Sequence, residues 1–339
     1  MDLNGKRILV SNCYGLGDLI TCTPALRRLK ELYPDCRVTL LGNSSHLDAV
    51  RGLPYIDQAV GLSRGGLFGR WRLLPVLRRQ DAVAFTDWQP QLLVLSYLLR
   101  IPLRGGVARE GRSACRYLTR RAEDRQYVFT EYAGERRARE LSEALGVTLD
   151  GDMTQCDVAL PGAQAQAAVD ALLAEVGLSA AEPFLLLAPF AANAVRHWPL
   201  SAARRFVQQA EAAFGCPVVV IGAAADRAAA EAMSRYSLAG KTTLPQLIEC
   251  IRRARLVVAT DSGPMHIAGA LGKKTAAIFS TNLPSRWAPR RNCRVVTLHF
   301  PCVPCGDQAD LCGTAGCIKG ISAEMVMEQC RELERMDEC

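Results

Sequence analysis

The sequence predicts an α/β protein with two halves, each built on its own parallel sheet. Short β-branched segments alternate with helix-length amphipathic segments, which is the pattern of βα units. The alternation stops at a polar stretch rich in alanine and glutamine, residues 161–183, and then restarts. A length of 339 residues suits two domains of about 150 each.

In the first half, apolar segments predict strands at 7–11, 37–42, 56–62 and 81–86. Between the first two we expect a helix with Thr23 as its cap and Pro24 in its first turn. In the second half the predicted strands are 184–190, 216–222, 255–261 and 274–280. The last periodic segment predicts a helix from Ser322 to about Met336, with Ser322 as its cap. Ligands of such sheets bind at the carboxyl ends of the strands, so we expect a site in the cleft between the domains.

Positive charge is concentrated in the first half of the chain. The formal net charge is +7; residues 1–150 carry 23 Lys and Arg against 16 Asp and Glu, and the rest carries 18 of each. Within 64–125, 13 arginines face five acids. The excess favours an acidic partner such as a phosphorylated substrate or an anionic membrane face, although a solvated basic surface would have the same composition. Few aromatic residues interleave with the arginines, so nucleic acid is not expected.

The beginning of the chain, MDLNGKRILV, lacks the apolar core of a signal peptide, and no apolar run reaches the ~18 residues of a membrane span. We therefore expect a cytoplasmic protein, in which 14 cysteines indicate free thiols or metal ligands rather than disulfides. Four of them, Cys302, Cys305, Cys312 and Cys317, have the spacing C-x2-C-x6-C-x4-C. This spacing suits a structural Zn²⁺ or iron site, and a loop of free thiols is the alternative.

A glycine-rich loop, SNCYGLGDLI (11–20), follows the first predicted strand. Gly15 and Gly17 permit a ligand to approach the backbone closely. The dinucleotide fingerprint GxGxxG would need a glycine where Ile20 stands, which weighs against a nicotinamide-dependent oxidoreductase. Taken alone, Asp18 could simply cap the following helix.

Two loops of the second half carry candidate donor-site residues. Arg196 and His197 follow the strand at 184–190, where a guanidinium can hold a diphosphate; an exposed arginine beside a packing tryptophan is the alternative. Asp226 opens the helix after the strand at 216–222, a place where an acid often meets a ribose hydroxyl and where it also suits a helix start.

The most specific segment is TDSGPMHIAGALG (260–272). The strand ends at Asp261 and Pro264 lies in the first turn of the next helix, so the amides of Ser262 and Gly263 are free to bind a phosphate. His266 lies on that first turn and can donate to the same anion. Capping by Asp261 alone would not explain the neighbouring Gly-Pro and histidine.

Taken in order, these segments resemble glycosyltransferase family 9, the bacterial ADP-heptose:lipopolysaccharide heptosyltransferases, over nearly the whole chain. The resemblance rests on GLGDLITCTPALRRLKELYP, RHWP and GKTTLPQLIECIRRARLVVATDSGPMHIAGALG. It implies the GT-B architecture, two Rossmann-like domains with parallel sheets facing a central cleft. Residues 1–160 would bind the acceptor, residues 161–321 would bind the nucleotide sugar, and a helix within 322–339 would pack back toward the first domain.

The resemblance also implies roles for individual residues. Asp18 matches the catalytic aspartate of the family, whose transfer is inverting and needs no catalytic metal. Arg196 stands where the family has a lysine, and Ala191 and Ala192 replace hydroxyl residues of some members. The implied donor-binding residues are Arg196, His197, Asp226, Asp261, Ser262, Gly263 and His266, and the implied acceptor-binding residues are Gly15, Gly17, Arg64, Arg70 and Arg72.

The activity implied is transfer of a heptose from ADP-heptose to a hydroxyl of an acidic lipopolysaccharide inner-core acceptor. The protein would be cytoplasmic, in peripheral contact with the inner membrane face. Two alternatives remain open: a protein or other small acceptor, and a non-catalytic protein that binds nucleotide sugars. Some relatives in the family, which modify proteins, hold iron on four cysteines near the C-terminus with other spacings.

Overall fold

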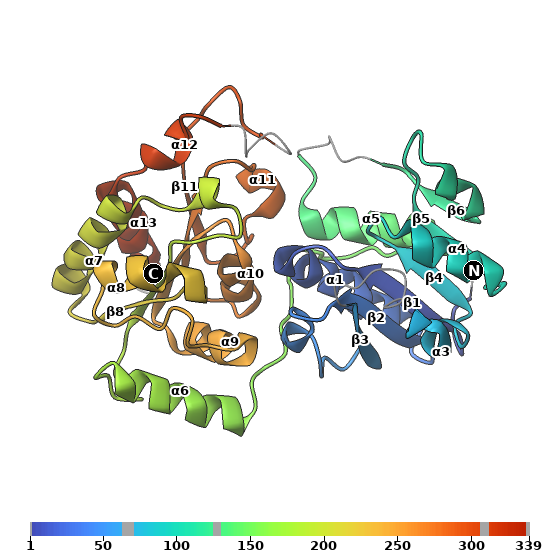
Figure 1. Ribbon diagram of the computed structural model, residues 1–339, viewed down its shortest axis with the longest axis horizontal. Coiled ribbons are helices and arrows are strands. Elements are labelled where there is room, and N and C mark those ends of the chain that lie inside the picture. The colour runs from blue at the N-terminus through green and yellow to red at the C-terminus, as the bar shows by residue number, and fades with distance from the viewer. Residues whose placement is uncertain (1, 63–70, 125–129, 306–311, 337–339) are drawn as a thin grey trace. The chain divides into compact units, whose positions relative to one another are not determined.

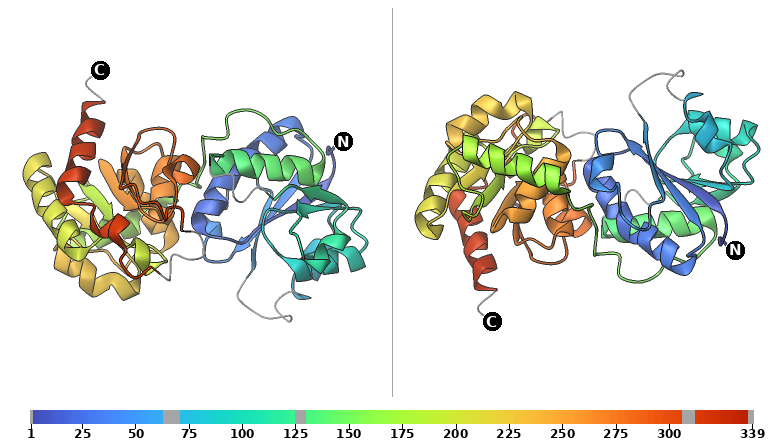
Figure 2. Two further views of the ribbon diagram at one scale, coloured as in Figure 1. Left: turned by 90° about the horizontal axis from the view of Figure 1, so that it is seen from above. Right: turned by 90° about the horizontal axis from the view of Figure 1, so that it is seen from below.

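The computed structural model describes residues 2–62, 71–124, 130–305 and 312–336. They form two compact units, Met1–Ala159 and Leu160–Cys339, each built on one parallel sheet (Figures 1 and 2). This confirms the predicted α/β class with a parallel sheet in each half. Among the described helices, none is long and apolar enough to cross a bilayer.

The sheet of the first unit has the strand order β3-β2-β1-β4-β5-β6. Its strands are β1 (Arg7–Asn12), β2 (Arg37–Asn43), β3 (Gln58–Leu62), β4 (Ala82–Phe85), β5 (Leu103–Val107) and β6 (Arg120–Ala122). The helices are α1 (Leu16–Leu32), α3 (Leu74–Leu77), α4 (Pro90–Leu98) and α5 (Ala133–Leu145), with 3-10 turns η1 (Leu47–Ala49) and η2 (Ser113–Tyr117). Helices α1 and α5 pack together on one face of the sheet, and α3, α4 and η2 cover the other (Figure 2).

Helix α1 begins eight residues earlier than predicted. Its N-cap is Gly15, and Pro24 lies inside the helix rather than in the first turn. Pro24 has no amide hydrogen for the Ile20 carbonyl, which an ordinary residue at this position would bond. The hydroxyl of Thr23 donates to that carbonyl at 2.6 Å instead. Thr23, the predicted cap, therefore lies inside the helix and satisfies the carbonyl that Pro24 leaves without an amide partner. The early start of the helix places Asp18 in its first turn.

The sequence analysis missed three strands, β5 and β6 in the first unit and β11 (Cys293–Thr297) in the second. Strand β5 has the sequence LRGGV, and its two glycines interrupt the β-branched pattern by which the other strands were predicted. Gly105 is required because a Cβ there would lie 2.0 Å from the carbonyl oxygen of Ala144 in α5. The glycine lets helix α5 lie directly on the sheet.

The second unit has the strand order β11-β10-β9-β7-β8. Its other strands, all predicted, are β7 (Leu185–Ala188), β8 (Val218–Val220), β9 (Leu256–Thr260) and β10 (Thr275–Phe279). Its helices are α6 (Ala163–Glu175), α7 (Leu200–Phe214), α8 (Arg227–Met233), α9 (Leu244–Arg253), α10 (Gly263–Ala270), α11 (Pro284–Trp287), α12 (Gly316–Lys319) and α13 (Ala323–Arg335), with 3-10 turns η3 (Ala194–Arg196) and η4 (Ala224–Asp226).

The terminal helix α13 has the predicted cap, since the Ser322 hydroxyl accepts from the amide of Met325. Its apolar side, including Val326, Met327 and Leu333, belongs to the core of the second unit together with residues of β7, β9 and α7. The described part of the helix is therefore a core element of that unit. Packing of the chain end toward the first unit stays a prediction.

Candidate functional site

Both sheets change strand order at a point flanked by the segments that the sequence analysis singled out. In the first unit the reversal lies between β1 and β4, and in the second between β7 and β9. Ligands of open parallel sheets bind outside the carboxyl ends of the strands at such a switch point. Asp18 follows β1, whereas Arg196 follows β7 and Asp261 follows β9, so the fold brings the last two together.

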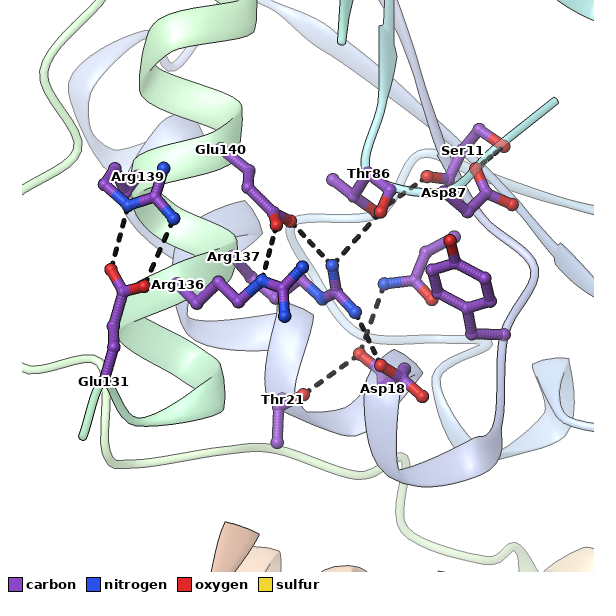
Figure 3. Close-up of polar contacts among 12 residues, drawn as sticks. Ser11, Asp18, Thr21, Thr86, Asp87, Glu131, Arg136, Arg137, Arg139 and Glu140 are labelled. Atoms are coloured by element: carbon purple, nitrogen blue, oxygen red, sulfur yellow. Dashed lines mark hydrogen bonds and ion pairs between the residues drawn. The ribbon is translucent and has the colours of Figure 1, made fainter. Parts of the chain in front are cut away.

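In the first unit, Asp18 is held by a buried guanidinium. Nη2 of Arg137, on α5, donates to Asp18 Oδ1 at 2.5 Å. Nη1 of Arg137 donates to Glu140 Oε2 at 2.6 Å and to the carbonyl of Thr86 at 3.1 Å (Figure 3). Glu140 is 1% exposed, and Arg136 donates to its other carboxylate oxygen at 2.7 Å. The network ties α1, α5 and the end of β4 to one another.

The carboxylates keep this guanidinium charged. Burial lowers the pKa of Arg137, but Glu140 and Asp18 outweigh it and raise that pKa above its ordinary value. Asp18 is not fully enclosed, with 22% of its side chain exposed. In the part of the chain that the structure describes, hydrogen bonds reach its Oδ1 and its carbonyl but not its Oδ2. One carboxylate oxygen is thus anchored and the other is available.

One of the two predicted glycines, Gly15, lies beside this available oxygen. Gly15 is the N-cap of α1 and Gly17 lies in the first turn. A Cβ on Gly15 would lie 3.5 Å from Asp18 Oδ2, which is ordinary contact distance, so the fold tolerates a side chain there. Its absence leaves Oδ2 uncovered. Asp18 is not the N-cap residue, which does not favour the capping alternative.

A second buried carboxylate, Asp87, supports the loop that carries the glycines. It lies at the end of β4, where Ser11 donates to Oδ1 at 2.6 Å and the amide of Cys13 donates to Oδ2 at 2.9 Å. Tyr14 follows in this loop; its ring lies 5.7 Å from the Arg137 guanidinium, and its hydroxyl accepts from Arg109 at 2.8 Å. Burial raises the pKa of Tyr14, so this hydroxyl stays neutral at physiological pH.

In the second unit, a pocket of about 360 Å³ opens at the carboxyl ends of β7 and β8. Its volume is in the range of small-molecule sites, about 300–1,000 Å³. The N-terminal ends of α9 and α10 lie at this pocket, where the first amides of a helix have no partner within the helix. It is lined by Ala188, Phe190, Ala191, Ala192, Ile221, Gly222, Ala223, Asp226, Thr242, Thr243, Leu244, Leu247, Ser262, Gly263 and Pro264. Three predicted donor-site residues, Asp226, Ser262 and Gly263, therefore meet in one place.

Arg196 and Asp261 form a pair beside this pocket. Nη1 of Arg196 donates to the Asp261 carbonyl at 2.9 Å and to its Oδ2 at 3.3 Å. Asn282 donates to the same Oδ2 at 2.5 Å. Trp198 holds the Arg196 loop in place, because its indole is 1% exposed in the core and donates to the Ile321 carbonyl at 2.9 Å. Trp198 is therefore a packing residue, as the alternative of an exposed arginine beside a packing tryptophan expected. Its packing also fixes the loop that carries Arg196.

The histidines have different places. His197 shares a 2.8 Å hydrogen bond with the Ala191 carbonyl and packs edge-on against Phe190, so it braces the pocket wall without lining the pocket. His266 is buried on α10 with its ring 5.9 Å from that of Trp287. Asp226 accepts from the Ala223 amide at 2.8 Å and also lines the pocket, so both of its predicted roles remain.

The arginines expected to bind the acceptor are only partly described. Arg64 and Arg70 lie outside the described residues, and Arg72 is exposed next to the exposed Trp71. Their roles stay predictions.

The four cysteines lie close enough to influence one another. Burial raises the pKa of Cys305, and Cys302, Cys317 and Cys312 raise it further. In contrast, hydrogen bonds from the backbone near Ala315 lower the pKa of Cys312. Within residues 2–62, 71–124, 130–305 and 312–336, no group of three or more His, Cys, Asp or Glu side chains is arranged to hold a metal ion.

Sequence reasoning did not identify Arg137, Glu140 or Asn282. Arg137 and Glu140 occur in GERRARELSEAL, where an (i, i+3) charge pair is typical of a solvated helix face. Only the buried side of α5 distinguishes them from their exposed neighbours. Asn282 lies in a short loop after β10, and nothing in its sequence context marks it.

The architecture is GT-B, which confirms the fold expected from the resemblance. A family model described as glycosyltransferase family 9 (heptosyltransferase) matches residues 70–315, more than half of the chain. The chain belongs to this family.

Two curated relatives resemble it in sequence. Lipooligosaccharide heptosyltransferase 2 of Campylobacter jejuni is 32% identical over 99 residues, which cover 29% of this chain and 31% of the relative. The chain thus matches less than a third of the length of that relative. Lipopolysaccharide core heptosyltransferase OpsX of Haemophilus influenzae is 22% identical over 310 residues, covering 85% of this chain and 82% of OpsX.

Solved structures share the fold at low sequence identity. A glycosyl transferase family 9 protein from Veillonella parvula has a TM-score of 0.81 at 19% identity, covering 98% of both chains. ADP-heptose lps heptosyltransferase II of E. coli has a TM-score of 0.77 at 19% identity, covering 98% of this chain and all of the other. The iron-containing dodecameric glycosyltransferase TibC of E. coli has a TM-score of 0.61 at 16% identity, covering 99% of this chain and 78% of TibC.

The charge network around Arg137 leads to a stability prediction. Replacing Glu140 with alanine leaves a buried guanidinium with one carboxylate partner, and breaking a buried pair in this way costs about 3–5 kcal/mol. We expect that loss in the free energy of unfolding measured in urea. Glu31→Ala is the matched control, because Glu31 pairs with Arg28 at 3.4 Å on the exposed side of α1, where a pair contributes less than about 1 kcal/mol. Equal losses in the two variants would contradict the structural role of the network.

Proposed function

We propose that the protein transfers a heptose from ADP-heptose to a hydroxyl of an acidic lipopolysaccharide inner-core acceptor. The observation that carries the proposal is the pair of switch points, with a partly exposed carboxylate at one and a nucleoside-sized pocket beside an arginine at the other. The family supports a heptosyl transfer. The donor and the acceptor follow the named relatives, one of which is an ADP-heptose lps heptosyltransferase and another a lipopolysaccharide core heptosyltransferase.

In the proposed reaction Asp18 is the general base. A sugar hydroxyl is a weak nucleophile, and a positioned carboxylate can remove its proton as the new bond forms. Oδ2 would accept that proton, since Arg137 already occupies Oδ1. The acceptor oxygen bonds to the anomeric carbon as the bond from that carbon to the diphosphate oxygen breaks, which inverts the configuration.

The second unit would bind the donor and stabilise the leaving ADP. The pocket suits the nucleoside, with Asp226 placed for a ribose hydroxyl and Thr242 and Thr243 supplying further polar groups. Arg196 and the free amides at the start of α10 would carry the charge that develops on the diphosphate. His266 of the same helix would complete this site. These groups can supply the charge stabilisation, so we propose that the transfer needs no catalytic metal.

The proposed setting is the cytoplasm, at the inner face of the membrane where such an acceptor lies. Arg72, together with Arg64 and Arg70, would attract its anionic groups, since exposed arginines match phosphate and carboxylate geometry. Gly15 and Gly17 would leave room for the acceptor sugar beside Asp18.

We also propose that the four-cysteine segment binds a structural metal ion. The mutual influence of the four thiols and the iron content of TibC support this. Within the described residues the thiols are not arranged to hold an ion. The cysteine side chains would therefore have to rotate toward the ion when it binds.

The test of the catalytic role is Asp18→Asn. The amide keeps the shape and a hydrogen-bond acceptor for Arg137 but cannot take a proton, so turnover per folded molecule should fall roughly 10²–10⁴-fold. ADP affinity should not change. Product formation is followed by mass spectrometry with a panel of sugar nucleotides and truncated core acceptors. The control is Asp150→Asn, which alters an exposed acid paired with Arg28 in the same unit and should keep full turnover. If Asp18→Asn lowers stability while turnover per folded molecule stays normal, Asp18 is structural.

The donor site is tested by Arg196→Ala. Loss of a charge-assisted hydrogen bond should weaken ADP binding, measured by calorimetry, by about 1.5–3 kcal/mol. Arg204→Ala, an exposed arginine on α7 of the same unit, serves as the control and should bind ADP normally. Wild-type affinity in the Arg196 variant would remove this arginine from the donor site.

The metal proposal is tested by elemental analysis of protein purified without chelators. We expect bound iron or zinc that is lost in the double variant Cys302→Ser with Cys305→Ser, with a lower melting temperature because metal binding adds to folding stability. The control is Cys330→Ser, a buried cysteine of α13 outside the cluster, which should retain the metal. Protein without metal above the buffer background would leave the alternative, free thiols.

A further inference from the structure

A set of aromatic and basic side chains lies on the first unit, on the face opposite α1 and α5. Tyr97, Leu98, Arg100 and Arg116 are exposed, and Arg104 and Tyr117 are half-buried. Tyr97 and Leu98 lie at the end of α4, and Tyr117 at the end of η2 packs its ring 4.7 Å from that of Tyr97. The guanidinium of Arg104 lies 5.5 Å from the Tyr97 ring, and that of Arg116 lies 4.9 Å from the Tyr117 ring. We refer to Tyr97, Leu98, Arg100, Arg104, Arg116 and Tyr117 as the aromatic–arginine face.

Tyr117 packs against the core of the first unit, whereas Tyr97 and Leu98 lie outside that core. Helix α4, PQLLVLSYL, has no charged residue, and Leu92 and Leu93 already fill the interior. On its other side Leu98 is 67% exposed and Tyr97 is 47% exposed. A helix that is apolar all round normally has both sides covered. The described residues of the chain leave this side uncovered.

The charge of the face has one sign. Segments 90–104 and 113–117 contain Arg100, Arg104 and Arg116 and no acid. Among the described ion pairs, none involves these three arginines, although Arg104 donates to backbone carbonyls. Arg100 occupies the left-handed position that ends α4, with φ of 56°, where glycine is the usual residue. The chain therefore has an arginine at a backbone position where a side chain is sterically disfavoured.

We propose that the aromatic–arginine face docks on an anionic phospholipid surface. This rests on the proposed function, since an acceptor anchored in a membrane requires the enzyme to work at its surface. Tyrosine rings suit the headgroup level of a bilayer, leucine can enter the acyl boundary, and arginines attract anionic headgroups while their stems cover apolar atoms. A second copy of the chain fits poorly, because a two-fold interface would bring the same cations together.

The test is co-sedimentation of the full chain with vesicles. One set contains phosphatidylcholine alone, and the other has a third of it replaced by phosphatidylglycerol. We expect at least about tenfold tighter binding to the anionic set, reduced by added salt because exposed charges are screened. The double variant Leu98→Glu with Arg116→Glu should lose at least about tenfold in that binding.

The matched control is the double variant Leu200→Glu with Arg204→Glu. It makes the same substitutions, with the same change in net charge, at exposed positions of α7 in the second unit. It should bind vesicles as the unchanged protein does. Melting temperatures of both variants should equal that of the unchanged protein, because the altered side chains are exposed.

Three results would overturn the proposal: equal binding to both vesicle sets, equal losses in the test and control variants, or a change of oligomeric mass in the Leu98 and Arg116 variant. Loss of oligonucleotide binding in that variant with vesicle binding retained would also reject it in favour of a nucleic-acid surface. Vesicle binding needs no turnover, so its outcome is separate from the proposed function. Turnover with a deacylated, water-soluble acceptor should be unchanged in the test variant and reduced with the acceptor in vesicles.

Discussion

The geometry of the first unit depends on one buried cation, Arg137. A charge that is almost removed from water needs opposite charges within hydrogen-bond distance. Glu140 of the same helix provides one, Asp18 of α1 provides the other, and the Thr86 carbonyl accepts a further bond. The cation therefore specifies how α5, α1 and the end of β4 meet, and it orients the carboxylate of Asp18 at the same time. The three hydrogen bonds of Arg137 thus both compensate its buried charge and fix the orientation of Asp18.

The second unit uses the same switch-point topology with a different balance of burial. Asp261 is the buried partner there and Arg196 is partly exposed, with side-chain exposures of 5% and 26%. The guanidinium is thus held through Nη1 by the buried acid.

The basic character of the first half is divided among different tasks in the structure. Arg136 and Arg137 are in the interior network, Arg109 contacts Tyr14, and Arg104 and Arg116 stack on tyrosines. Composition predicted an acidic partner from the sum of these charges. The individual positions show that part of the sum stabilises the fold, and that exposed Arg116 lies on the same face as exposed Tyr97 and Leu98.

The sequence by itself determined the two-part α/β fold, eight of the strands, the capped terminal helix and the strand-to-helix turn within 260–272, because these depend on local periodicity and on residues close together in the chain. It could not reveal β5, whose glycines are needed only because α5 lies against them, or the interior start of α1, where the Thr23 hydroxyl replaces the amide missing at Pro24. Nor could it distinguish Arg137 and Glu140 from solvated charges, or connect Asn282 with Asp261. Tertiary structure decided these points, since burial and contacts between distant segments assign to a side chain an environment that its neighbours in the sequence do not encode.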